Sequence, residues 1–175
     1  YSKGIIVFLD ALSLLEESYR RKINVKIVGK EAELSWSMLN DEIVRRNIQN
    51  FVCFVGQKYG EEKLNIYHNT DILIYPTLND AFPVVLLEAM QFGIPVIASI
   101  EGAIPDIIED GINGFLVEKN KPEQISSKLM HLINNPDLRN DMGRNGRIKF
   151  LNNYTIDKFE LNMSGVFKKI VDSIK

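Results

Sequence analysis

The sequence predicts a doubly wound α/β fold, in which a parallel sheet carries helices on both faces. Short apolar runs of four or five residues recur along the chain, and segments with helical periodicity separate them. The clearest example covers residues 71–99, which read as strand, loop, helix and strand. Two buried strands joined by a helix are parallel neighbours in a right-handed crossover. The pattern therefore predicts a parallel sheet built from such units.

Length and composition predict one globular domain over residues 1–175, because 45% of the residues are hydrophobic and 25% are charged. The net charge of −2 gives no overall reason to expect nucleic acid or an anionic membrane as partner. There is no signal peptide, and no apolar run approaches the ~20 residues that span a bilayer. The single cysteine, Cys53, excludes a disulfide within the chain and is typical of a small core residue. These features favour a cytoplasmic protein without a transmembrane segment.

The first part of the chain predicts helix, strand, helix and strand. Helical spacing of apolar residues covers positions 3–19 and 32–47, and the two expected strands cover 24–28 and 51–55. Gly29 and Gly56 follow these strands directly. A glycine at a strand end lets the backbone come close to a ligand.

The central unit follows a short helix expected over residues 61–69. It consists of a strand over 72–75, a helix over 83–92 and a strand over 96–100. Pro83 suits the first turn of that helix, and Gly93 with Pro95 suits its end. The remainder predicts a short helix from Pro105 to Gly111, an edge strand over 115–117, and helices over 122–134, 136–151 and 156–174.

Two acidic residues in the central unit point to a binding site. Glu88 is the ionisable group of an otherwise almost entirely apolar helix, and a carboxylate placed there needs a partner. Asp80 lies beyond the carboxyl end of a strand, where open α/β sheets bind their ligands. The helix start between the two acids offers backbone N–H groups that favour a phosphate. One site would therefore recognise a diol and a phosphate.

A structural explanation accounts for the same residues. Glu88 and Gln91, three apart, would form the solvated stripe of an amphipathic helix, with Asp80 as its N-cap. Lys3, at a helix start, is either a solvated cation or the partner of a bound anion. His68 and His131 have no companions at ligand spacing, so the sequence predicts no metal site.

Residues 80–99, DAFPVVLLEAMQFGIPVIAS, resemble the nucleotide-sugar-binding motif of the retaining GT-B glycosyltransferases, the "glycosyl transferases group 1" family (family 4). That family shows two acids separated by seven residues, which is the spacing of Asp80 and Glu88. Lys3 with Gly4 and residues 26–29, 54–56, 102–106 and 110–117 resemble further family segments in the right order. The resemblance implies the Rossmann-like C-terminal half of a GT-B fold.

The resemblance also implies roles for individual residues. Glu88 would accept hydrogen bonds from ribose hydroxyls, and Asp80, in place of the usual glutamate, would meet the hydroxyls of the transferred sugar. Lys3 would meet the diphosphate, and these three residues are the catalytic candidates. The donor-binding candidates are Lys3, Gly29, Gly56, Gln57, Asp80, Ala81, Phe82, Pro83, Val84, Val85, Glu88 and Gly102.

The function implied is that of a hexosyltransferase-type enzyme of bacterial polysaccharide biosynthesis. It would move a sugar from a nucleoside-diphosphate sugar, UDP being favoured over GDP, to a glycan or lipid-linked acceptor. No metal or other cofactor is expected. The enzyme would act in the cytoplasm, at the inner face of the membrane in its full-length form. The alternative is a Rossmann-like nucleotide-binding or interaction module without catalysis.

The start of the chain suggests an excerpt of a longer protein, because Tyr1 is not an initiator methionine. In the resembling family an acceptor-binding domain and a mid-sheet strand come before this point. That strand would lie between those at 24–28 and 72–75. We therefore expect an additional strand to fill this interval, and direct pairing of the two strands would contradict the expectation.

Overall fold

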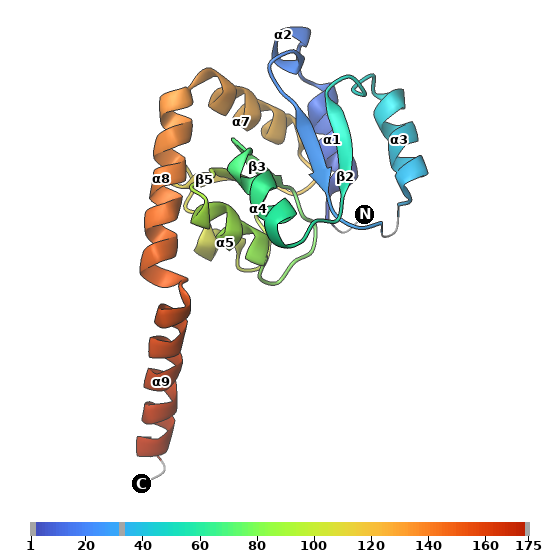
Figure 1. The fold of residues 1–175 in the computed structure, drawn as a ribbon. Helices are drawn as coiled ribbons and strands as arrows, with labels where there is room; N and C mark the ends of the chain where they lie inside the picture. Colours follow the sequence, from blue (N-terminus) through green and yellow to red (C-terminus); the bar gives the residue numbers. More distant parts are fainter. Residues whose placement is uncertain (1–2, 32–33, 174–175) are drawn as a thin grey trace.

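The computed structural model describes residues 3–31 and 34–173 and has the expected mixed α/β architecture (Figure 1). The strands are β1 (Val25–Val28), β2 (Val52–Gly56), β3 (Leu73–Tyr75), β4 (Val96–Ser99) and β5 (Gly114–Val117). The helices are α1 (Ile5–Ser13), α2 (Glu17–Arg20), α3 (Trp36–Arg45), α4 (Gly60–His68), α5 (Val84–Gln91), α6 (Ile104–Ile107), α7 (Pro122–Asn134), α8 (Pro136–Asn153) and α9 (Ile156–Ser173).

The described strands pair in parallel, and they form two sheets. β1 pairs with β2, whereas β3, β4 and β5 follow one another in that order, so β5 lies at the sheet edge as predicted. Within the described residues β1 and β3 do not pair with each other. Direct pairing of β1 with β3 would have contradicted an additional strand between them, and it is not found. That strand stays a prediction.

Alternate residues of the three-stranded sheet pack into two different cores. Ile97 of β4 joins the core formed with α1 and α7, whereas its neighbours Val96 and Ala98 join the core formed with α5 and α6. This alternation follows from the two-residue period of a strand. Val52 of β2 contributes to the first core as well, so α1 and its neighbours connect the two sheets.

Some predicted boundaries are wrong. The helix expected over 3–19 is divided into α1 and α2, because the Arg20 side chain donates to the carbonyl oxygens of Ser13 (2.6 Å) and Leu15 (2.7 Å) at the break. Pro83 is the extended N-cap of α5 rather than a residue of its first turn. The helix expected over 32–47 begins at Trp36, after the Ser35 cap, and positions 32 and 33 lie outside the described residues.

Cys53 is exposed, so its prediction as a core residue is wrong. Its cross-strand partner Lys26 is exposed too, whereas Val25 and Val52 pack into the core on the other face. An apolar run therefore did not indicate burial on both faces here.

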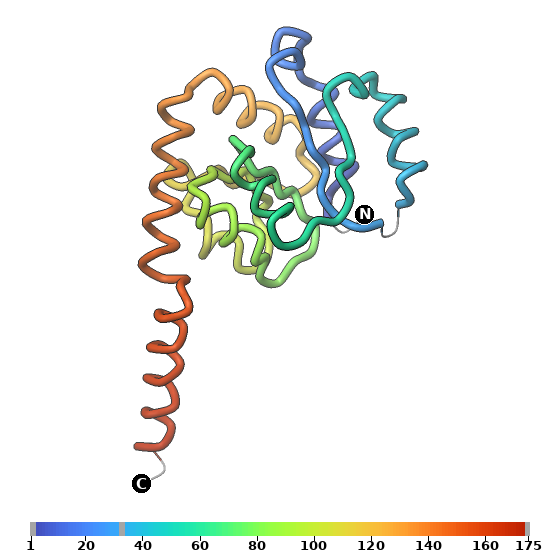
Figure 2. Tube along the Cα trace, viewed as in Figure 1, coloured from blue at the N-terminus to red at the C-terminus, as the bar shows by residue number. Residues whose placement is uncertain are grey.

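The C-terminal helix α9 extends away from the body of the domain (Figures 1 and 2). None of its described residues is buried, and it exposes large apolar side chains such as Phe159 and Phe167. In the described part of the chain, no helix combines the length and apolar character that crossing a membrane requires.

Candidate functional site

Asp80 lies in the loop beyond the carboxyl end of β3 and is the centre of a hydrogen-bonded cluster. Its Oδ2 atom is 2.5 Å from the Lys3 ammonium and 2.6 Å from the Tyr75 hydroxyl, both of which donate to it. Lys3 also donates to the carbonyl oxygen of Asn79 at 3.4 Å and lies 5.9 Å from the centre of the Tyr75 ring. The structure therefore brings together Lys3 and Asp80, which are 77 residues apart in the chain.

The electrostatics of this cluster favour a charged pair. Burial alone would raise the pKa of Asp80, but the hydrogen bonds from Lys3 and Tyr75 lower it below its ordinary value. The hydrogen bond to Asp80 raises the pKa of Lys3, although partial burial opposes this change. Burial, followed by the hydrogen bond to Asp80, raises the pKa of Tyr75, so its hydroxyl remains a donor.

Gly4 allows Lys3 to reach this position. It is the N-cap of α1 and has a φ of 70°, in the left-handed region that favours glycine. A Cβ atom at this residue would lie 1.8 Å from the carbonyl oxygen of Pro76. The start of α1 therefore approaches the end of β3 more closely than any other residue type would permit.

Gly102 brings the loop after β4 against the same segment. Its φ is 48°, and a Cβ atom there would lie 2.2 Å from the carbonyl oxygen of Asp80. The Ala103 N–H donates to the carbonyl oxygen of Ala81 at 3.0 Å. The backbone at Gly102 is therefore in direct contact with the Asp80 loop.

A second lysine contacts the loop after β3. Lys119 follows β5, forms an ion pair with Glu101, and donates to the carbonyl oxygen of Leu78 at 3.3 Å. Lys3 and Lys119 therefore contact neighbouring residues of one loop from different parts of the chain.

Glu88 lies one turn into α5 and has two partners on α4. The Lys63 ammonium donates to Oε1 at 2.5 Å, and the Tyr67 hydroxyl donates to Oε2 at 2.7 Å. The Glu88 side chain is 28% exposed. The carboxylate is therefore neither unpartnered nor part of a fully solvated stripe, while Gln91 is exposed as the structural explanation expected.

The start of α5, between the two acids, is open to solvent. Pro83 has no N–H, and the first amides of any helix, here those of Val84 and Val85, have no intrahelical partner. Val84 and Phe82 are about half exposed. This arrangement can accept an anion on backbone N–H groups.

The ends of β1 and β2 lie side by side. The Gly29 N–H donates to the carbonyl oxygen of Gly56 at 3.1 Å. Gly56 has a φ of 71°, and a Cβ atom there would meet no neighbour within 4 Å. Gln57 follows in the exposed loop that leads to α4. These positions share the carboxyl edge of the strands with Asp80, and a single cleft that contains all of them stays a prediction.

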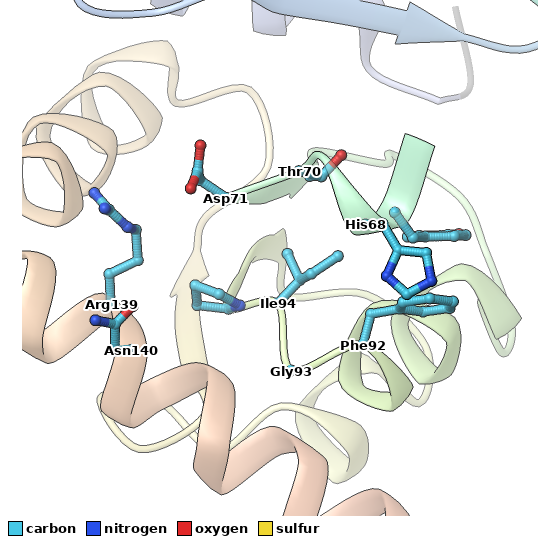
Figure 3. Close-up of a pocket in the computed structure, with 10 residues that line it drawn as sticks. His68, Thr70, Asp71, Phe92, Gly93, Ile94, Arg139 and Asn140 are labelled. Atoms are coloured by element: carbon cyan, nitrogen blue, oxygen red, sulfur yellow. The ribbon is translucent and has the colours of Figure 1, made fainter. Parts of the chain in front are cut away.

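The cavities described in the structure lie at the opposite edge, where β3 and β4 begin. One of about 170 Å³ is lined by Tyr67, His68, Thr70, Asp71, Phe92, Gly93, Ile94, Pro95, Arg139 and Asn140 (Figure 3). A second shares His68, Phe92 and Gly93 with it and includes Arg147. Neither is lined by Asp80 or Glu88. Among the described residues, no three His, Cys, Asp or Glu side chains gather as a metal site would require.

Comparison with known proteins identifies the family. The model of the family described as "Glycosyl transferases group 1" matches residues 1–149. The chain belongs to this family. An uncharacterised glycosyltransferase from Methanocaldococcus jannaschii is 28% identical over 170 residues, which are 97% of this chain and 46% of that protein. The chain thus spans about half the length of this curated relative.

Solved glycosyltransferase structures share the fold. Anabaena Alr3699/HepE in complex with UDP-glucose matches 96% of this chain and 46% of its own, with a TM-score of 0.84 and 19% identity. The C-terminal domain of a group 1 family protein from Francisella tularensis matches 89% of this chain and 81% of its own, with a TM-score of 0.79 and 27% identity. The GT-B relationship inferred from the motifs is therefore confirmed.

Five residues of this group 1 glycosyltransferase domain contact the candidate site and were not predicted from the sequence. They are Lys63, Tyr67, Tyr75, Glu101 and Lys119. A sequence signal existed for two of them, because Lys63 and Tyr67 are four apart on a helix that begins at the ligand edge. Glu101 and Lys119 depend on how distant loops pack, which spacing does not reveal. Tyr75 ends β3 and lies only five residues before Asp80.

Proposed function

We propose that this chain is the donor-binding domain of a retaining glycosyltransferase that transfers a hexose from a UDP-sugar to a glycan or lipid-linked acceptor. The observation that carries the proposal is the arrangement of two differently partnered carboxylates, Asp80 and Glu88, on either side of an open helix start. The fold shared with a UDP-glucose-bound structure supports a nucleotide-sugar ligand.

Each part of the donor has a matching group. Glu88 accepts hydrogen bonds from the ribose hydroxyls, which are charge-assisted and therefore selective. The N–H groups of Val84 and Val85 and the positive end of α5 receive the diphosphate. Asp80 accepts from hydroxyls of the transferred sugar, and its side chain is one methylene shorter than that of glutamate.

Lys3 binds the diphosphate while it keeps its hydrogen bond to Asp80. An ammonium group has three N–H donors, of which Asp80 and Asn79 receive two. The third can donate to a phosphate oxygen. Asp80 thus orients the cation, and the cation offsets the charge that develops on the leaving diphosphate. Fixed cations and backbone dipoles supply this stabilisation, so binding requires no metal.

Isothermal calorimetry with UDP and GDP, each with and without magnesium, tests the proposal. UDP should bind without magnesium and more tightly than GDP. Glu88→Ala should weaken UDP binding by roughly 1–3 kcal/mol, because a charged hydrogen-bond acceptor is lost. Glu160→Ala, on the exposed face of α9, is the matched control and should not change binding.

An absolute requirement for magnesium would contradict the proposed electrostatics. Sugar transfer separates the enzyme from a non-catalytic nucleotide-binding module. We expect the 175-residue chain alone to bind the nucleotide without turnover, and transfer to require an acceptor-binding domain and to take place in the cytoplasm.

A further inference from the structure

The Glu88 carboxylate is held entirely from the α4 side in the described structure. One oxygen accepts from the Lys63 ammonium and the other from the Tyr67 hydroxyl. Lys63 and Tyr67 are four residues apart, so they lie on the same face of α4, and each donates to a different oxygen of the carboxylate. Two donors on two different oxygens fix the plane of a carboxylate, whereas a single donor would leave it free to rotate.

The Tyr67 donor is itself rigid. Tyr67 is buried, and its ring stacks on Phe92 with centroids 5.1 Å apart and an interplanar angle of 14°. The His68 ring packs edge-on against the same Phe92 at 4.9 Å. Burial, followed by the hydrogen bond to Glu88, raises the pKa of Tyr67, so the hydroxyl keeps its proton at any physiological pH.

An ionised carboxylate offers about four acceptor positions, two on each oxygen. Among the described residues, Lys63 and Tyr67 fill one position on each oxygen, so a second position on each oxygen can accept from a ligand. Two adjacent acceptors in a fixed plane match the two neighbouring hydroxyls of a ribose.

We propose that Lys63 and Tyr67 are positioning residues that hold the Glu88 carboxylate for recognition of the ribose diol. This inference rests on the proposed function, because it assigns Glu88 to the ribose. Lys63 has a second effect: it offsets the negative charge of Glu88, which would otherwise repel the diphosphate of the same ligand. Its side chain is 39% exposed, so this charge effect is partly screened by solvent.

The test compares UDP with 2′-deoxyuridine diphosphate by calorimetry, since the two ligands differ in one ribose hydroxyl. The measured quantity is the ratio of their dissociation constants. For the unmodified chain this ratio should be about tenfold in favour of UDP, the size expected for a hydrogen bond to a charged group. Glu88→Gln should bring the ratio close to one.

Tyr67→Phe and Lys63→Met should each lower the ratio to about threefold, because a carboxylate with one remaining donor is less well oriented. Lys63→Arg should restore most of it. A purely structural role would weaken both ligands equally and leave the ratio unchanged. Two matched controls should keep the tenfold ratio. Tyr154→Phe removes a hydroxyl that donates to the backbone carbonyl oxygen of Asp106 at 3.4 Å, and Arg144→Met removes an exposed partner of Asp141.

A ratio that stays at tenfold in both Tyr67→Phe and Lys63→Met would overturn the inference and leave the proposed function intact. A ratio near one in the unmodified chain, or no binding of UDP at all, would overturn both, because Glu88 would then have no ribose diol to recognise.

Discussion

At the scale of single residues, the Asp80 carboxylate already has hydrogen-bond partners before any ligand binds. It accepts from Lys3 and Tyr75, and a backbone hydrogen bond from Phe82 also lowers its pKa. Its side chain is 17% exposed, against 57% for Lys3, so the acid is the sheltered member of the pair. The donor sugar would therefore meet an acid whose charge and position are already set.

The pH dependence of stability follows from the directions of these pKa changes. Asp80 has a lowered pKa in the folded chain, so its stabilising effect is present above an ordinary carboxyl pKa of about 4 and is lost as the pH falls through the folded value. Lys3 has a raised pKa, so its effect is present below about 10.5 and is lost as the pH rises through the folded value. We expect the difference in unfolding free energy between the unmodified chain and Asp80→Asn to be constant from about pH 5 to 9.

Urea denaturation at a series of pH values measures this difference. It should shrink below about pH 4, with Asp157→Asn on the exposed helix α9 as a control that shows little difference at any pH. A difference that changes near neutral pH would mean that another group titrates in the cluster.

The sequence predicted the acids of the site better than their partners. The spacing of Asp80 and Glu88 was visible in the chain, and so was the pair of Lys3 and Gly4. The contact between Lys3 and Asp80 required the approach of α1 to the end of β3, which depends on the packing of the Gly4 backbone against Pro76. Such contacts between distant segments have no periodic signal.

At the scale of elements, two glycines determine how α8 crosses α5. Gly143 of α8 faces Gly93, which follows α5 and has a φ of 68°. A Cβ atom at Gly143 would lie 2.0 Å from the Gly93 carbonyl oxygen. The backbone of α8 is therefore in direct contact with the segment that follows α5, and Met142 beside this contact is buried.

Gly143→Ala should destabilise the domain by roughly 1–3 kcal/mol, because α8 must move to accommodate the added methyl group. The matched control is Gly165→Ala in α9, where a Cβ atom would meet no neighbour within 4 Å. This second change should be neutral or stabilise by up to about 1 kcal/mol, since alanine favours the helix. Thermal unfolding of both variants measures the two changes in stability. Equal changes would contradict the close contact between Gly143 and Gly93.

Strands and long helices were predicted closely, because their periodic patterns extend over several turns or residues. The observed range of α7, Pro122–Asn134, is the predicted one, and β4 ends one residue before its predicted end. The errors occurred where a single side chain decides the outcome. Arg20 ends a helical pattern by binding carbonyl oxygens, and the exposure of Cys53 depends on which face of its sheet is covered.

At the scale of the whole molecule, α9 is the element that contributes least to the body of the domain. No described residue of this helix is buried, although several of its exposed residues are large and apolar. α8, by contrast, packs against the segment after α5 through Gly143, and its Met142 is buried in the core formed with α1 and α7.

Removal of residues 156–175 should therefore change the unfolding free energy of the domain by less than about 1 kcal/mol. Removal of residues 136–175, which also deletes α8, should abolish cooperative unfolding, because the core beneath α8 would be exposed. Denaturant titration followed by circular dichroism measures both. A large loss of stability in the shorter deletion would show that α9 supports the body directly.

The division of the strands into two sheets has a consequence for how the domain would respond to its ligand. Gly29 and Gly56 end the strands of one sheet, whereas Asp80 and α5 follow a strand of the other. No hydrogen-bond ladder joins the described strands of the two sheets, so side-chain packing holds them together, in the core that contains both Val52 of β2 and Ile97 of β4. A nucleotide that touched both sets of loops would add a second connection between the two sheets. Because it would bind only the folded arrangement, its binding would stabilise the domain as a whole.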